Sequence, residues 1–137
     1  MPENDFCFID SNIWLYAFTD DDSRKTDLAQ AIINTCKPVV SVQVINEVCV
    51  NLIKRAEFPE VRIGELIETF YEKYSVAELH KGVLLTASEL RREYSFSYWD
   101  SVIAASALDA DVKILYSEDM QDGLVIRKIL KIINPLK

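Results

Sequence analysis

The sequence predicts an α/β protein with three layers, in which helices cover both faces of a mainly parallel central sheet. Short runs of β-branched and aromatic residues alternate with longer stretches of helical periodicity along the whole chain. Strands separated by helices imply right-handed crossovers, and these produce parallel pairing. The length of 137 residues predicts one domain, residues 1–137. Half the residues are apolar, which favours a folded globule over disorder.

The first third of the chain reads as strand, helix, helix and strand. The apolar run Phe6–Ile9 predicts a buried strand, and the helical stretch 13–18 follows it directly. An acidic turn then opens a helix from Arg24 to about Cys36, because acids near a helix start suit its dipole. A proline precedes a short β-branched strand, Val39–Val42.

The middle of the chain is predicted to be mostly helical. A helix runs from about Gln43 to Ala56 and is broken at Phe58-Pro59. Between Ile63 and Tyr74, apolar residues recur with the spacing of an amphipathic helix. A short strand at 75–79 and a helix at 81–94 follow.

The last third contains one more helix and two strands. Ser97 opens a helix at 98–108, and small residues within it allow close packing on the sheet. Strands are predicted at 113–116 and 129–133, the second ended by Asn134-Pro135.

Four acidic residues lie where such a fold would present them to one pocket: Asp10, Glu47, Asp100 and Asp119. Asp10 and Asp119 follow strands, and open α/β sheets place ligand sites at the carboxyl ends of strands. Glu47 and Asp100 lie in apolar helical patterns, where an unpaired carboxylate is costly. Carboxylates brought together without a cation repel each other. We therefore expect a hard divalent metal held by oxygen ligands.

Each acid also has a structural explanation. Asp10 could cap the following helix, and Glu47 could form a salt bridge or face solvent. Ser97 and Asp100 have the spacing of a capping box, which is compatible with a metal role. Asp119 could belong to an ordinary solvated loop.

Neighbouring polar residues support or compete with the four acids. Asn12 could serve the cap or hold Asp10 in place, and Ser117 could orient a ligand through its hydroxyl. Glu118 and Asp122 compete with Asp119 as ligands.

Other residues around the acids have less specific interpretations. The aromatic residues near the acids could be core, pocket wall or base-stacking groups; they are Trp14, Tyr16, Tyr98 and Trp99. The candidate phosphate contacts are as consistent with plain surface charges; they are Arg24, Lys25, Lys54 and Arg55.

Composition and the missing motifs exclude several classes. The net charge of −7 is opposite to that of a non-specific nucleic-acid binder, although a metal enzyme can meet phosphates through its cation. Cys7, Cys36 and Cys49 sit in apolar runs without zinc-type spacing, so we expect reduced core thiols in a cytosolic protein. No apolar stretch is long enough to span a bilayer, and the acidic residues 1–5 do not resemble a signal peptide. The sequence has no phosphate-binding glycine loop and no nucleophile with a paired base, and His80 reads as a helix-start residue.

Five segments, taken together and in order, resemble the PIN-domain family, and VapC-type toxins of bacterial toxin–antitoxin pairs in particular. They are Phe8–Ile13, Ser41–Glu47, Tyr98–Leu108, Leu115–Met120 and Ile132–Pro135.

The resemblance implies a parallel sheet between helices and metal-dependent cleavage of single-stranded RNA. It places the acidic site on Asp10, Glu47, Asp100 and Asp119, with Asn12 and Ser117 in support. It also implies Mg²⁺ or Mn²⁺, a homodimer and a cognate antitoxin that holds the enzyme inactive. Asp122 could assist or replace Asp119, since the family varies there.

Two other functions are compatible with parts of the pattern. A haloacid-dehalogenase-type phosphatase also places Asp after its first strand, but it needs a second acid two residues later, where this chain has Asn12. A PIN-like module could bind nucleic acid or protein without catalysis if the metal never binds.

Overall fold

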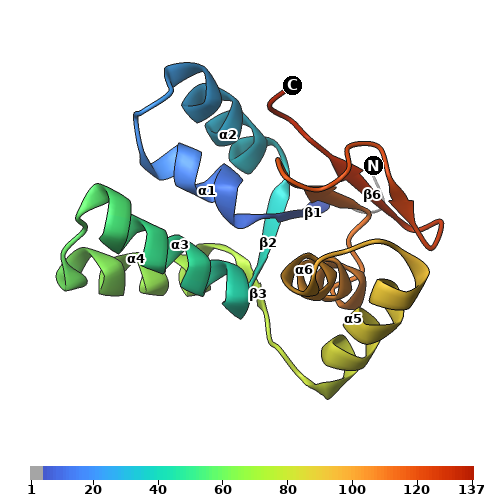
Figure 1. The fold of residues 1–137 in the computed structure, drawn as a ribbon. Helices are drawn as coiled ribbons and strands as arrows, with labels where there is room; N and C mark the ends of the chain where they lie inside the picture. Colours follow the sequence, from blue (N-terminus) through green and yellow to red (C-terminus); the bar gives the residue numbers. More distant parts are fainter. Residues whose placement is uncertain (1–4) are drawn as a thin grey trace.

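The computed structural model describes residues 5–137, so the expectation for residues 1–4 lies outside the described part. The described strands are β1 (Phe6–Ile9), β2 (Lys37–Ser41), β3 (Ser75–Ala77), β4 (Ile114–Tyr116), β5 (Val125–Ile126) and β6 (Leu130–Ile133). They form one sheet at the centre of the molecule (Figure 1). The strand order is β3-β2-β1-β4-β6-β5. All pairings are parallel except that of β5 with β6. The predicted mainly parallel sheet is confirmed.

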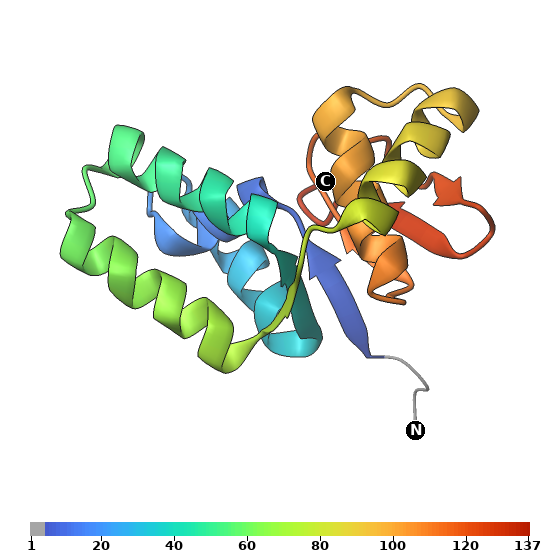
Figure 2. The ribbon, with the colours of Figure 1, turned by 90° about the horizontal axis from the view of Figure 1, so that it is seen from below.

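Helices form the two outer layers. They are α1 (Ser11–Phe18), α2 (Ser23–Thr35), α3 (Val42–Ala56), α4 (Glu60–Lys73), α5 (Lys81–Glu93) and α6 (Tyr98–Asp109). Figures 1 and 2 show α1 to α4 on one side of the sheet and α5 with α6 on the other. The structure therefore has the predicted α/β/α architecture. In the described part of the chain, no helix is long and apolar enough to cross a membrane.

Side-chain caps start the helices close to the predicted residues. Ser41 Oγ accepts a hydrogen bond from Val44 N at 3.2 Å, and Ser97 Oγ accepts one from Asp100 N at 3.2 Å. The strand predicted at 39–42 ends one residue earlier, because Val42 already belongs to α3.

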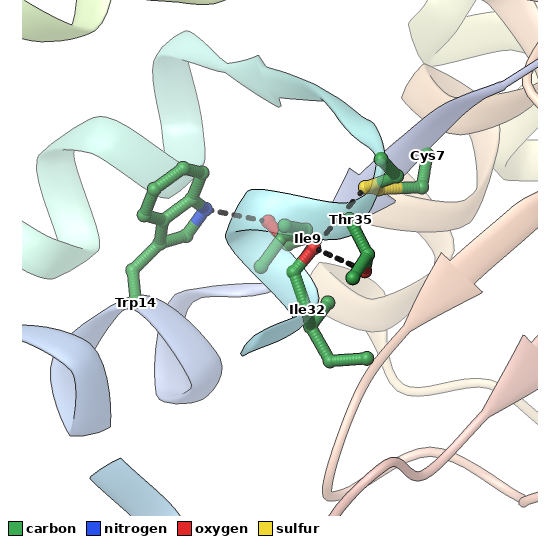
Figure 3. Close-up of a disulfide and its surroundings, with 6 residues drawn as sticks. Cys7, Ile9, Trp14, Ile32 and Thr35 are labelled. Atoms are coloured by element: carbon green, nitrogen blue, oxygen red, sulfur yellow. Dashed lines mark hydrogen bonds between the residues drawn. A yellow bond between two sulfur atoms is a disulfide. The ribbon is translucent and has the colours of Figure 1, made fainter. Parts of the chain in front are cut away.

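The core lies between the sheet and the helices. Phe8, Ile9, Ile13 and Trp14 at the β1–α1 junction are fully buried. The Trp14 indole N–H donates to the Ile9 carbonyl at 3.0 Å (Figure 3), so this large side chain leaves no polar group unpaired. Packing therefore anchors the residues on both sides of Asp10.

Strand β5 was not predicted from the sequence. A three-residue turn, 127–129, joins it to β6, with Arg127 and Lys128 at φ 52° and 63° and Ile129 N donating to Ile126 O at 3.0 Å. Turns of this kind usually contain Asn or Gly, which accept positive φ easily. The Arg-Lys pair carries no such signal.

The expectation of three reduced thiols is wrong for two of them. Cys7 and Cys36 form a disulfide (Figure 3), while Cys49 is free and buried. Parallel pairing places Cys7 beside Pro38, and Cys36 caps the end of α2 two residues before it. The two Cα atoms are therefore 6.1 Å apart, a separation that a disulfide can bridge.

Candidate active site

The site lies where the sheet order changes direction. Strand β1 has β2 on one side and β4 on the other, although β4 comes much later in the chain. Asp10 N donates to Tyr116 O at 3.0 Å, which continues the β1–β4 pairing beyond the end of β1. Asp10 and Ser117 therefore leave the sheet side by side. Such a switch point, at the carboxyl ends of the strands, is the usual ligand site of an open α/β sheet.

All four acids singled out from the sequence line one cavity of about 290 Å³. They come from the β1–α1 junction, from α3, from the first turn of α6 and from the loop after β4. The other lining residues are Ser11, Asn12, Asn51, Arg55, Trp99 and Ile103. The fold thus gathers carboxylates that are as far as 109 positions apart in sequence, from Asp10 to Asp119.

Asp10 is held in the cavity by two hydrogen bonds. Its Oδ1 accepts a hydrogen bond from Ser11 N at 2.7 Å, and its Oδ2 accepts one from Ser117 Oγ at 3.0 Å. Burial raises the pKa of Asp10 to about 6. The two hydrogen bonds lower this pKa, while the charges of Glu47 and Asp100 raise it further. The predicted cap is real, and it leaves Asp10 facing the cavity.

Glu47 is held by two side-chain donors. Its Oε2 accepts a hydrogen bond from Ser11 Oγ at 2.8 Å, and its Oε1 accepts one from Gln43 Nε2 at 2.9 Å. Among the described residues it forms no salt bridge, so the alternative of an ion pair is wrong. Ser11 connects the two acids, since its N–H binds Asp10 and its hydroxyl binds Glu47.

Asp100 and Asp119 complete the acidic wall. Burial raises the pKa of Asp100; a hydrogen bond with Ser97 lowers it, and the charges of Asp119 and Glu47 raise it. Asp119 is exposed at its edge of the cavity, and its Oδ2 accepts a hydrogen bond from Asn12 Nδ2 at 2.6 Å. Asn12 therefore holds Asp119, whereas the sequence reasoning had considered it as a support for Asp10.

The competing acids are not brought to the cavity. Asp122 accepts a hydrogen bond from Asn134 N at 2.8 Å and forms an ion pair with Lys137 at 3.3 Å. These contacts lower its pKa, with the bond from Asn134 the larger cause. Glu118 forms an ion pair with Lys25 at 2.7 Å. Both carboxylates bind other parts of the chain, which leaves Asp119 as the acid of this loop that lines the cavity.

One of the four candidate phosphate contacts lies at the site. Arg55 lines the acidic cavity, about two helical turns beyond Glu47 on α3. Arg24 instead donates to the carbonyl of Leu136 at 2.8 Å, and Lys25 binds Glu118. Sequence reasoning did not single out Ser11 or Asn51. Each follows an acid at a spacing that could have indicated it, directly after Asp10 and four residues after Glu47.

The donor set suits a hard divalent cation. The cavity offers carboxylate oxygens from four residues, and oxygen donors are those that Mg²⁺ and Mn²⁺ prefer. Mutual repulsion contributes to the raised pKa values of Asp10 and Asp100, and a cation bound among the carboxylates would relieve it. Within residues 5–137, no three Asp, Glu, His or Cys side chains already stand close enough to hold an ion. The residues fit the metal in chemistry, and binding would draw their side chains together.

Comparison with known proteins gives one family and several similar folds. Residues 7–122 match the PIN domain. VapC20 from Mycobacterium tuberculosis, a sarcin–ricin loop cleaving toxin, is 18% identical with a TM-score of 0.67, over 82% of this chain and 89% of that chain. A toxin–antitoxin complex from Klebsiella pneumoniae is 17% identical with a TM-score of 0.70, over 94% and 97%. VapBC2 from Rickettsia felis, bound to a DNA fragment from its promoter, is 15% identical with a TM-score of 0.64, over 93% and 96%. At these low sequence identities, the comparisons show a similar fold and nothing more. Comparison with curated proteins gives no match.

Proposed function

The chain belongs to the PIN domain family and has the fold of its VapC-type members, and on this premise we propose that it is a metal-dependent endoribonuclease. It would hydrolyse phosphodiester bonds in single-stranded regions of RNA, as the toxin of a toxin–antitoxin pair. The observation that supports this most directly is the single cavity lined by Asp10, Glu47, Asp100 and Asp119.

The acids would share the work of holding Mg²⁺ or Mn²⁺ and placing water. When bound, the cation would supply charge neutralisation for the scissile phosphate and a more acidic water. Asp10 and Asp119 would be direct ligands, because Ser117 and Asn12 already orient their carboxylates.

The remaining two acids would act on the attacking water. Asp100 has a raised pKa, which suits a group that accepts a proton from this water. Each Glu47 oxygen accepts one hydrogen bond, from Ser11 or Gln43, and keeps a free lone pair with which Glu47 would position the water.

A phosphatase of the haloacid-dehalogenase type has no support at this site. Its acid two residues after the first aspartate is replaced by Asn12, whose amide N–H is bonded to Asp119. Among the residues of the cavity wall, no other acid takes that place on α1.

The test is cleavage of a labelled single-stranded RNA by the purified chain, with and without Mn²⁺. We expect cleavage that needs the ion and stops when EDTA is added. Asp10→Asn should lower the rate by at least about 100-fold. Losing a residue that only supports a metal ligand costs up to about 100-fold, and Asp10 would be a ligand itself. The exposed Asp27 of α2 offers a matched control, since Asp27→Asn makes the same chemical change away from the site. Cleavage by Asp10→Asn at the wild-type rate would refute the assignment.

The proposed partners follow from the family. We propose a homodimer in the cytoplasm, with a cognate antitoxin that blocks the acidic cavity. A similar fold has been solved in a toxin–antitoxin complex. Positively charged side chains would match the cavity, because its lining carries four acids and one arginine. A purified complex that cleaves RNA as fast as the free chain would refute this mode of inhibition.

A further inference from the structure

A second cavity, of about 440 Å³, adjoins the acidic one. It is lined by Val42, Gln43, Asn46, Glu47, Leu79 and Trp99. Trp99 and Glu47 line both cavities. A ligand with a phosphate in the acidic cavity can therefore place its neighbouring group in the second one. The volume lies within the range of small-molecule sites.

The wall of this second cavity exposes large apolar side chains. Trp99 is 61% exposed and Leu79 is 46% exposed. Tyr98 packs edge-on against Trp99 with ring centroids 5.1 Å apart, and the Arg91 guanidinium lies 4.4 Å from the centre of the Tyr98 ring. Trp99 is thus supported on one side and open on another. An exposed indole offers a flat surface on which an unpaired base can stack.

Gln43, which lines the cavity, carries an unsatisfied acceptor just beneath the cavity surface. Gln43 Nε2 donates to Glu47 Oε1 at 2.9 Å, and this bond fixes which way the amide faces. Gln43 Oε1 is buried and has no hydrogen-bond partner among the described residues. A buried acceptor without a donor is costly. A ligand that brings an N–H group to this atom would remove the cost.

We propose that this cavity binds one base of single-stranded RNA, next to the scissile phosphate. The base would stack on Trp99, and its exocyclic amino group would donate to Gln43 Oε1 once the Gln43 side chain turns this atom toward the cavity. Apart from Glu47, the lining residues are uncharged, which suits a neutral base in a protein of net charge −7. The inference rests on the proposed nuclease function and adds a substrate preference to it.

The geometry favours cytosine over uracil. The two pyrimidines are of similar size, but cytosine presents an amino donor where uracil presents a carbonyl acceptor. At that exocyclic position only cytosine can donate a hydrogen bond to Gln43 Oε1. The preference should therefore depend on Gln43, while the gain from stacking should depend on Trp99.

The first experiment measures kcat/KM for Mn²⁺-dependent cleavage of labelled oligo(C). Base stacking on an aromatic side chain is worth roughly a 5- to 150-fold change in binding. Trp99→Ala should lower kcat/KM within that range, mainly through KM, and Trp99→Phe should retain most of it. Tyr71→Ala is the matched control, because Tyr71 is a half-exposed aromatic on α4 that lines neither cavity. Circular dichroism should show that all three variants fold.

The second experiment compares oligo(C) with oligo(U) of the same length. Wild type should prefer oligo(C), and Gln43→Leu should bring the ratio of the two kcat/KM values close to one. Gln43→Leu also removes the hydrogen bond to Glu47. If this were its only effect, both rates would fall equally and their ratio would stay the same. An unchanged ratio would overturn the role of Gln43.

The outcomes separate this inference from the proposed function. Suppose that wild type cleaves both RNAs and that Trp99→Ala cleaves each of them as fast as wild type does. The base site is then wrong, while the proposed nuclease function stands. That result would also follow if the cavity holds a side chain of a partner protein instead. If wild type cleaves neither RNA, binding is measured by fluorescence anisotropy. Weaker oligo(C) binding by Trp99→Ala would then support the base site alone, and no binding by wild type would overturn both.

Discussion

Replacing Asp10 with asparagine should stabilise the metal-free protein while removing its activity. Burial and the neighbouring acids raise the pKa of Asp10 from its ordinary 3.8 to about 6. A carboxyl group with a raised pKa in the folded state stabilises the fold most at low pH, and this contribution is lost as pH rises through about 6. Above that pH, ionised Asp10 costs the folded state about 3 kcal/mol. Asparagine removes the charge and keeps an acceptor for Ser11 N.

The magnitude depends on pH in a way that isolates this residue. Asp10→Asn should increase the free energy of unfolding by up to about 3 kcal/mol at pH 8, and by less than about 1 kcal/mol at pH 4. The assay is urea unfolding in EDTA at both pH values, followed by circular dichroism. Asp27→Asn, the exposed control, should show no such pH-dependent gain. An Asp10→Asn variant that is no more stable than wild type at pH 8, or equally changed at both pH values, would refute the reasoning.

Three further predictions follow from the same contacts. Mn²⁺ should bind less tightly as pH falls below about 6, because Asp10 must lose its proton to bind the ion. The Kd should rise about tenfold per pH unit if one proton is displaced. Calorimetry that shows the same Kd at every pH between 5 and 7 would contradict this. Ser117→Ala should lower the Mn²⁺ affinity and should lower the free energy of unfolding by about 1–3 kcal/mol, because the buried Asp10 loses a hydrogen-bond donor. Calorimetry measures the affinity and urea unfolding measures the stability. Unchanged values would count against this role of Ser117. Asp122→Asn should change RNA cleavage by no more than about twofold, because its carboxylate binds Asn134 N and Lys137 and not the cavity; a large loss would return Asp122 to the site.

The sequence was sufficient for most of the fold because local and global signals agree in it. The strands that carry the site are short apolar runs, and the helix between Ile63 and Tyr74 has the periodicity of one buried face. The β5–β6 turn could not be seen, because Arg127 and Lys128 hold positive φ without the residues that usually indicate it.

The acidic site was predictable because two of its acids follow adjacent parallel strands. Asp10 and Asp119 lie after β1 and β4, and the strand order of the fold makes these neighbours. The sequence could not decide between Asp119 and Asp122, since both are in one loop. Their positions depend on the C-terminal segment, which binds Asp122 through Asn134 and Lys137.

The hydrogen bonds of Ser11 and the disulfide could not be predicted from the sequence, because they depend on how helices and strands pack together. Ser11 joins Asp10 to Glu47 only because α1 and α3 pack together, since Ser11 and Glu47 are 36 residues apart in the chain. Cys7 and Cys36 meet because β1 and β2 pair in a particular parallel register. Sequence spacing alone gives neither relation.

The most direct test of the account is a crystal structure of the protein grown with Mn²⁺, with anomalous diffraction used to locate the ion. We predict an anomalous peak in the acidic cavity, coordinated by carboxylate oxygens of Asp10 and Asp119, with Glu47 and Asp100 turned toward it. A cavity without a peak at saturating Mn²⁺, or an ion bound elsewhere while these four side chains keep apart, would contradict the central claim.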